Sequence, residues 1–236
     1  MPEKKWDNKS RVAVIDLGSN TFHIIVVELD FTAETFHLLY RDRDFVYLSK
    51  DGIQLISEKS IERGMQCLKS FKEKATEYNV ESIIAIGTAA LRSANNSQLF
   101  TSRVHQKLGI KINVISGERE ARLIHNGTLF GQNKSVGPRL IMDIGGGSVE
   151  FIISLDGGVA YFNSKNVGIS ILKNKFRNDS DLQENKRSIY SFLIENLGEV
   201  IEAIDHFKPQ VLVGPSGPFE MLRVLSWPAF AGSLHA

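Results

Sequence analysis

Two acidic residues follow short apolar runs and stand just before glycine-containing turns. Asp16 precedes a turn with one glycine, and Asp143 precedes three consecutive glycines. A carboxylate in such a turn suits a hard cation such as Mg²⁺, which binds through one or two carboxylates and takes its other ligands from water and phosphate oxygens. The alternative is that each carboxylate only accepts hydrogen bonds from turn amides. For Asp143 we favour the metal site, and for Asp16 both interpretations stay open.

Three glycine turns follow predicted buried strands, over residues 16–20, 143–148 and 214–217. Glycine lets backbone amides approach a ligand closely, and successive amides in such a turn can hold an anion without net charge on the protein. A tight turn after a strand can need glycine for its backbone conformation alone, so a single turn of this kind is weak evidence. Three such turns in one chain favour phosphate binding. Glu150 follows Asp143 by seven residues, so a hairpin at the second turn would bring the two carboxylates together.

A further acidic residue lies in the first turn of a helix predicted over residues 117–130. Helical spacing puts Glu120 on one face with small or apolar residues three, four and seven positions later, which are Leu123, Ile124 and Gly127. A carboxylate on such a stripe is unfavourable unless it is paired or faces a cleft, where its pKa can rise toward neutrality and suit a general base. The alternative, a glutamate stabilised by the helix dipole, fits Glu120 only partly.

Arg92 lies between a strand predicted over residues 82–86 and a helix that begins near residue 95. A guanidinium there can bind phosphate oxygens through two parallel hydrogen bonds, although a lone arginine is more often a surface residue. No group of His and Cys residues has the spacing of a zinc site. We therefore interpret His23 and His125 as structural residues.

The overall composition excludes several classes of protein. The chain has 236 residues, with 28 Lys and Arg against 27 Asp and Glu, so we expect no nucleic-acid partner and no anionic membrane surface. No apolar run approaches the roughly 20 residues of a membrane-spanning helix, and the first residues lack the apolar segment of a signal peptide. With Cys67 as the single cysteine, no internal disulfide can form, and we expect a cytoplasmic protein.

The pattern of apolar residues predicts an α/β fold that is repeated once along the chain. The two aspartate turns are 127 residues apart, which is too long for a solenoid repeat and suits a duplicated domain. A polar segment at residues 131–138 is the candidate linker, so we predict lobes over residues 1–130 and 131–236. The predicted strands cover residues 12–15, 22–27, 35–40, 82–86, 110–115, 140–142, 151–153, 160–163 and 211–213, and the predicted helices residues 61–78, 95–108, 117–130 and 181–207.

Four segments, in chain order, carry a more specific resemblance. They read AVIDLGSNTFHIIVVEL, GTAALRSANN, VISGEREARLIHNG and DIGGGSVEFII. Together they closely resemble the exopolyphosphatase and guanosine pentaphosphate phosphohydrolase (Ppx/GppA) family, and the likeness continues through the turn at residues 213–217. The resemblance implies a duplicated two-lobe actin-like ATPase (ribonuclease H-like) fold around a phosphate cleft, which agrees with the repeat inferred above from the residues.

The resemblance also implies an activity and the residues that perform it. The activity is release of the terminal phosphate from inorganic polyphosphate or guanosine pentaphosphate with Mg²⁺. Glu120 would activate the attacking water, and Glu150 would act in catalysis and, with Asp143, in metal binding, while Asp16 stays a candidate metal ligand. The phosphate ligands implied by the family, together with those of the third turn, are Ser19, Asn20, Thr21, Arg92, Gly145, Gly146, Gly147, Ser148, Ser216 and Gly217.

Three features depart from the family pattern. Arg119 replaces an acidic residue beside Glu120, and residues 45–49 (FVYLS) replace the usual Val-Arg-Leu-Gly block, which removes one expected basic contact. The chain also ends at Ala236, where we expect the second lobe to be incomplete. A homodimer is one way in which such a lobe could be completed.

Two other functions stay open from the sequence. One is a non-catalytic sensor of guanosine tetra- or pentaphosphate or of polyphosphate. The other, less favoured, is a phosphotransferase of the sugar-kinase type, because fold alone does not decide function. The sequence does not choose between polyphosphate and guanosine pentaphosphate, since both present the same terminal group.

Overall fold

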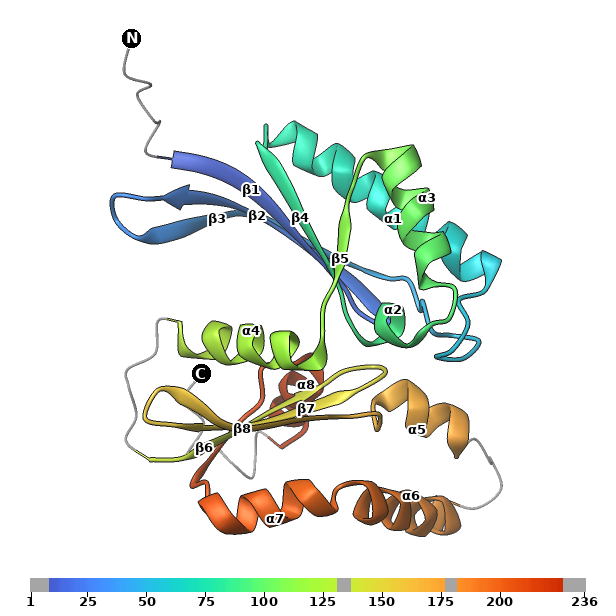
Figure 1. Cartoon of the computed structure of the whole chain (residues 1–236), viewed down its shortest axis with the longest axis vertical. Helices are drawn as coiled ribbons and strands as arrows, with labels where there is room; N and C mark the ends of the chain where they lie inside the picture. Colours follow the sequence, from blue (N-terminus) through green and yellow to red (C-terminus); the bar gives the residue numbers. More distant parts are fainter. Residues whose placement is uncertain (1–8, 131–136, 177–181, 227–236) are drawn as a thin grey trace. The chain divides into compact units, whose positions relative to one another are not determined.

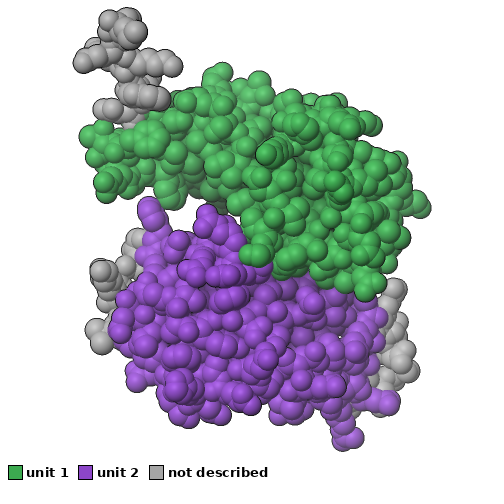
Figure 2. Space-filling view, in the orientation of Figure 1, with its two compact units in different colours: residues 1–116 green, residues 117–236 purple. Residues whose placement is uncertain are grey.

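The computed structural model describes residues 9–130, 137–176 and 182–226. The chain divides into two compact units, Met1–Ser116 and Gly117–Ala236, which Figure 2 shows in green and purple. Each unit has its own sheet with helices packed against it. This division differs from the predicted boundary between residues 130 and 131, because the helix after Ser116 belongs to the second unit.

The first unit holds a five-stranded sheet. Its elements are β1 (Lys9–Leu17), β2 (Thr21–Asp30), β3 (Thr35–Phe45), α1 (Glu58–Glu77), β4 (Ser82–Gly87), α2 (Ala89–Ser93), α3 (Ser97–Leu108) and β5 (Ile112–Val114). The strand order is β3-β2-β1-β4-β5, with an antiparallel meander of β1 to β3 and parallel additions of β4 and β5. Alternate residues of β1, namely Ala13, Ile15 and Leu17, are fully buried in the core under α1 and α3 (Figure 1).

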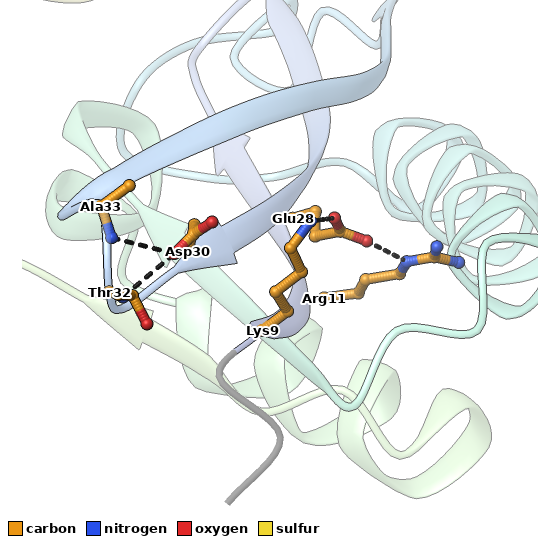
Figure 3. A network of polar contacts seen from close by, with 6 residues as sticks. All are labelled: Lys9, Arg11, Glu28, Asp30, Thr32 and Ala33. Atoms are coloured by element: carbon orange, nitrogen blue, oxygen red, sulfur yellow. Dashed lines mark hydrogen bonds and ion pairs between the residues drawn. The ribbon is translucent and has the colours of Figure 1, made fainter.

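Charged residues stabilise the end of this meander that lies away from the glycine turn (Figure 3). Glu28 on β2 accepts hydrogen bonds from Lys9 Nζ at 2.9 Å and Arg11 Nε at 3.1 Å. The hydrogen bond from Lys9 is the main reason that the pKa of Glu28 is lowered. The next turn is closed by two backbone amides that donate to the Asp30 carboxylate. These contacts lie at the opposite end of β1 and β2 from the glycine turn.

The second unit holds a four-stranded sheet in the order β8-β7-β6-β9. Its elements are α4 (Gly117–Leu129), β6 (Arg139–Ile144), β7 (Val149–Leu155), β8 (Gly158–Lys165), α5 (Ile169–Lys175), α6 (Leu182–Asn196), α7 (Gly198–Phe207), β9 (Val211–Val213) and α8 (Gly217–Ser226). Strand β7 is covered on both faces. Val149 and Phe151 pack with side chains of α6 and α7, whereas Ile152 packs with Ala121 of α4 (Figure 1). The face of β7 under α4 therefore carries its even-numbered residues.

The two units repeat one design. Strands β6, β7, β8 and β9 pair as β1, β2, β3 and β4 do, with an antiparallel meander followed by a parallel strand. The turns after β1 and β6 are closed alike, because Gly18 N donates to Thr21 O at 3.1 Å and Gly145 N donates to Ser148 O at 3.0 Å. The duplicated two-lobe α/β fold of the actin-like class is thereby confirmed.

Several element boundaries differ from those predicted. The helix predicted over residues 181–207 is two helices, α6 and α7, which separate at Leu197 before Gly198, a residue that weakens a helix interior. The short helices α2 and α5 and the helix α8 were not predicted. The start of the predicted helix at Asp181 and most of the predicted linker lie outside the described residues.

Candidate functional site

The centre of the candidate site is a buried carboxylate on the middle strand of the second sheet. Glu150 on β7 is 2% exposed, and its side chain lies on the sheet face under α4, in line with Ile152. Strand pairing puts Asp143 of β6 directly opposite Glu150 on one side and Ser164 of β8 opposite it on the other. Directly opposed residues on neighbouring strands share a face. The predicted hairpin at the second glycine turn is confirmed, and with it the pairing of Asp143 with Glu150.

Two hydroxyl groups bind the same oxygen of this carboxylate. Ser148 Oγ donates to Glu150 Oε1 at 2.6 Å, and Ser164 Oγ donates to the same atom at 2.8 Å. Ser148 ends the glycine turn, and its own side chain is buried. Both bonds favour the ionised carboxylate, and they fix the direction in which it points.

Burial nevertheless keeps Glu150 partly protonated near neutral pH. The pKa of Glu150 is raised to about 7, first by loss of hydration, then by the nearby charge of Glu120 and least by that of Asp143. The hydroxyl donors act in the opposite direction but do not cancel these effects. Burial also raises the pKa of Asp143, against a hydrogen bond from Ser216. A carboxyl with a pKa near 7 can both accept and return a proton at physiological pH.

Helix α4 supplies the second carboxylate. The helix packs on β7 and β8, and a Cβ added to Gly117 would lie 3.2 Å from Ser164 Cβ, so its first turn lies close to β8. Glu120 in that turn is half-buried, and its charge acts on Glu150. The face assigned to the helix from sequence was partly wrong. Leu123 is 37% exposed and Gly127 is exposed, whereas the buried positions are Ala121 and His125.

A polar contact holds α4 on the sheet. His125, which is 3% exposed, has its Nε2 atom 2.9 Å from Ser154 Oγ of β7. Ser154 lies on the same strand face as Glu150, four residues further along. The interpretation of His125 as a structural residue agrees with this buried position between helix and strand.

The second glycine turn is held from outside by the segment that starts α5. The amides of Ile169 and Ser170 donate to Gly145 O and Gly146 O at 3.0 and 2.8 Å. A Cβ added to Gly168 would lie 2.5 Å from Gly146 O, so only glycine fits this approach. Hydrogen bonds from the backbone at the start of α5 thus hold the turn of residues 145–148 in its conformation.

The third turn is tied to the second at the end of β6. Ser216 Oγ accepts a hydrogen bond from Ile144 N at 3.0 Å and also bonds the Asp143 side chain. Gly214 packs directly under the Phe219 ring, where an added Cβ would come within 2.0 Å. Gly217 begins α8. Ser216 therefore lies next to the carboxylates, as the assignment of this turn to the site requires.

The remaining predicted residues belong to the first unit and form a group of their own. Ser19 is buried, its carbonyl accepts from Ser49 N, and Asn20 O accepts from Tyr47 N at 2.8 Å, so the first turn is bound by the chain after β3. Arg92 on α2 is half-buried and donates through Nη1 to Ile115 O at 3.1 Å. Asp16 is exposed at the end of β1, opposite His23.

The residues of the second unit fit a magnesium ion chemically. Asp143 and Glu150 are opposed carboxylates beside the glycine turn of residues 145–148, and a cation would favour their ionised forms. Within the described ranges, no group of three or more His, Cys, Asp or Glu side chains is arranged to hold a metal. Magnesium needs no such group, because it takes most of its ligands from water and phosphate.

Three residues that shape this site were not identified from sequence. Ser164 was missed because its contact depends on the register of β7 with β8. Gly117 and Gly168 were missed because a close backbone approach by a distant segment has no local signature. The serine and both glycines lie outside the three glycine turns predicted to bind phosphate.

The fold and the site define a class of protein, which comparison with solved structures makes specific. Two units that repeat one sheet, each with a glycine turn after its first strand, are typical of the actin-like ATPase class. An exopolyphosphatase from Cytophaga hutchinsonii matches 96% of this chain, over 73% of its own, with a TM-score of 0.88 and 32% identity. A PPX-GPPA enzyme from Aquifex aeolicus matches 95% of this chain, over 74% of its own, with a TM-score of 0.73 and 26% identity.

The chain belongs to the Ppx/GppA phosphatase family, whose model matches residues 26–226. A guanosine-5'-triphosphate,3'-diphosphate pyrophosphatase from Aliivibrio fischeri is 34% identical over 212 residues, which are 89% of this chain and 42% of that protein. The corresponding protein of Vibrio vulnificus is also 34% identical, over 92% of this chain and 44% of its own length. The chain thus spans less than half the length of these curated relatives. Within the described residues, no helix combines the length and apolar character that crossing a membrane requires.

Proposed function

We propose that this chain is a magnesium-dependent hydrolase of phosphoanhydrides, which releases the terminal phosphate from inorganic polyphosphate or guanosine pentaphosphate. The observation that carries the proposal is the buried Glu150, with its raised pKa, between the glycine turn and Glu120. The relatives named above, an exopolyphosphatase and a guanosine pentaphosphate pyrophosphatase, support both substrates.

In the proposed reaction, the residues divide into those that hold phosphate and those that handle a proton. The amides of residues 145–147, the Ser148 hydroxyl and the third turn at Ser216 and Gly217 bind phosphate oxygens. Ser19, Asn20, Thr21 and Arg92 do the same in the first unit. Phosphoryl transfer depends mostly on such positioning and charge neutralisation.

Glu120 orients the attacking water and accepts its proton, and Glu150 beside it holds a proton only while no metal ion is bound. The charge of Glu120 raises the pKa of Glu150, so the two carboxylates titrate as an interacting pair. Bound Mg²⁺ would supply charge neutralisation on the phosphate oxygens, with Asp143 and Glu150 as its protein ligands and Asp16 as a further candidate.

A binding-only role leaves these carboxylates without a purpose. Two acidic side chains beside an anion-binding turn repel phosphate and would weaken a sensor, whereas a hydrolase uses them for the metal and the water. The single cysteine, Cys67, is buried and reduced, which fits the cytoplasm as the compartment in which these substrates would be met.

Phosphate release is the direct test. The purified chain is incubated with long-chain polyphosphate or guanosine pentaphosphate, with Mg²⁺ or with EDTA, and released phosphate is measured. We expect release only with the metal, and we expect Glu120→Gln to lower kcat by about 10²- to 10⁴-fold, the usual contribution of a general base. Glu118→Gln, in the same helical turn but exposed and paired with Arg122, is the matched control. A folded chain that releases no phosphate from either substrate contradicts the proposal.

A further inference from the structure

Two aromatic side chains lie exposed beside the first glycine turn. Phe45, the last residue of β3, is 55% exposed, and Tyr47 is 45% exposed. Their rings are stacked, with centroids 5.9 Å apart and an interplanar angle of 22°. The Arg43 guanidinium lies 5.8 Å from the centroid of the Phe45 ring. We call Phe45 and Tyr47 the aromatic platform.

The backbone fixes this platform to the turn that we propose as a phosphate ligand. Phe45 pairs directly with Thr21, the first residue of β2 after the turn, and Tyr47 N donates to Asn20 O at 2.8 Å. Two residues later, Ser49 N donates to Ser19 O at 3.3 Å. The rings and the turn are therefore one continuous piece of structure within the first unit.

Tyr47 adopts a backbone conformation that is unfavourable for its residue type. Its φ of 49° lies in the left-handed region, which glycine and asparagine enter much more readily than a bulky residue does. The surrounding structure holds it there, because its carbonyl accepts from Arg63 Nη2 at 3.0 Å and from Ser60 Oγ at 3.3 Å. A strained, well-anchored position that nevertheless exposes a large ring is better explained by binding than by packing.

We propose that the aromatic platform stacks against the nucleobase of a guanosine polyphosphate whose phosphates are bound by the first turn; this rests on the function proposed above. Aromatic side chains bind nucleobases through their faces, and the Arg43 charge against Phe45 adds a cation–π contribution to the same stack. Inorganic polyphosphate has no base and gains nothing from the platform. Of the two proposed substrates, the platform favours guanosine pentaphosphate.

Calorimetric titration of the 236-residue chain carrying Glu120→Gln, the parent here because it hydrolyses the ligands slowly, with guanosine pentaphosphate and with inorganic tripolyphosphate, both with Mg²⁺, tests the inference. We expect Tyr47→Ala to weaken binding of the pentaphosphate about tenfold or more, the usual effect of losing one base–aromatic stack, and to change tripolyphosphate binding less than twofold. Tyr47→Phe keeps the ring and should restore pentaphosphate binding. Phe31→Ala removes an exposed ring at the other end of the β2–β3 hairpin and should change neither affinity.

Each outcome decides a different claim. If Tyr47→Ala weakens both ligands equally, the turn has been damaged and the platform is refuted, and if it weakens neither, the platform is also refuted. In both cases the proposed function stands, because the parent chain still binds the phosphates. If the parent binds neither ligand, the proposed function fails and the platform fails with it.

Discussion

Replacing Glu150 with glutamine should make the folded chain more stable at neutral and alkaline pH. Ser148 and Ser164 both donate to Oε1 of Glu150, and an amide oxygen at the same place accepts the same two bonds. The substitution therefore keeps the hydrogen bonds and the volume of the side chain, and it removes only the buried negative charge and its repulsion by Glu120.

The size and the pH range of the effect follow from the raised pKa of Glu150. Below pH 4.5, the ordinary value, this group is protonated in both the folded and the unfolded chain and has no effect on their balance. Above that value the unfolded chain ionises while the folded one keeps its proton up to a pKa of about 7, so the free energy of unfolding falls as pH rises through this interval. At about 1.4 kcal/mol for each unit of pKa difference, the group lowers stability by up to about 3 kcal/mol above pH 7.

Urea unfolding followed by circular dichroism measures this directly. The free energy of unfolding of Glu150→Gln and of the parent chain should agree near pH 4.5 and diverge in favour of the variant as pH rises to 8. Comparing two proteins at each pH cancels the titration of all groups that do not interact with residue 150. Glu118→Gln, an exposed acidic residue of α4, is the control and should follow the parent. If the difference in the free energy of unfolding between Glu150→Gln and the parent is constant from pH 4.5 to 8, the raised pKa of Glu150 is refuted.

Three further predictions concern the neighbours of Glu150. Glu120→Gln removes the repelling charge and should lower the pKa of Glu150, which a carboxyl-carbon NMR titration would report; an unchanged midpoint would show that the two residues do not interact. Ser164→Ala removes a donor to the carboxylate and should raise the pKa of Glu150 in the same titration, and a fall would contradict the bond at 2.8 Å. Ser154→Ala leaves His125 Nε2 buried without its bond, so the free energy of unfolding should fall by about 1–3 kcal/mol, whereas Ser102→Ala on the exposed face of α3 should have almost no effect.

The parts of the fold that were predictable are those with a local signature. The spacing of Asp143 and Glu150 around three glycines indicated that a hairpin at this turn would bring the two carboxylates together, and the strands do pair in this way. The repeat of the aspartate turn predicted the duplicated architecture. A turn is a local feature, because its residues determine its own backbone hydrogen bonds, and the two turns are closed by matching bonds.

The parts that were missed depend on distant contacts. The buried face of α4 was misassigned because His125 is polar and its burial becomes favourable only through Ser154 on β7. The apolar Leu123 was counted in its place, although it is more than a third exposed. Ser164 was missed for a similar reason, since its register against β7 includes an irregularity after Ile153 that no short pattern predicts.

The duplication also separates two chemical tasks between turns of the same form. Opposite Asp143 in the second unit stands Glu150, whereas opposite Asp16 in the first unit stands His23. Where the second turn has Glu150, the first has His23, an imidazole whose pKa is lowered by desolvation and by the Arg43 charge. The first turn is thus left with one exposed carboxylate and with Arg92 in the same unit, conditions that favour holding an anion. The second turn has two opposed carboxylates with raised pKa values, which are conditions that favour holding a proton or a metal.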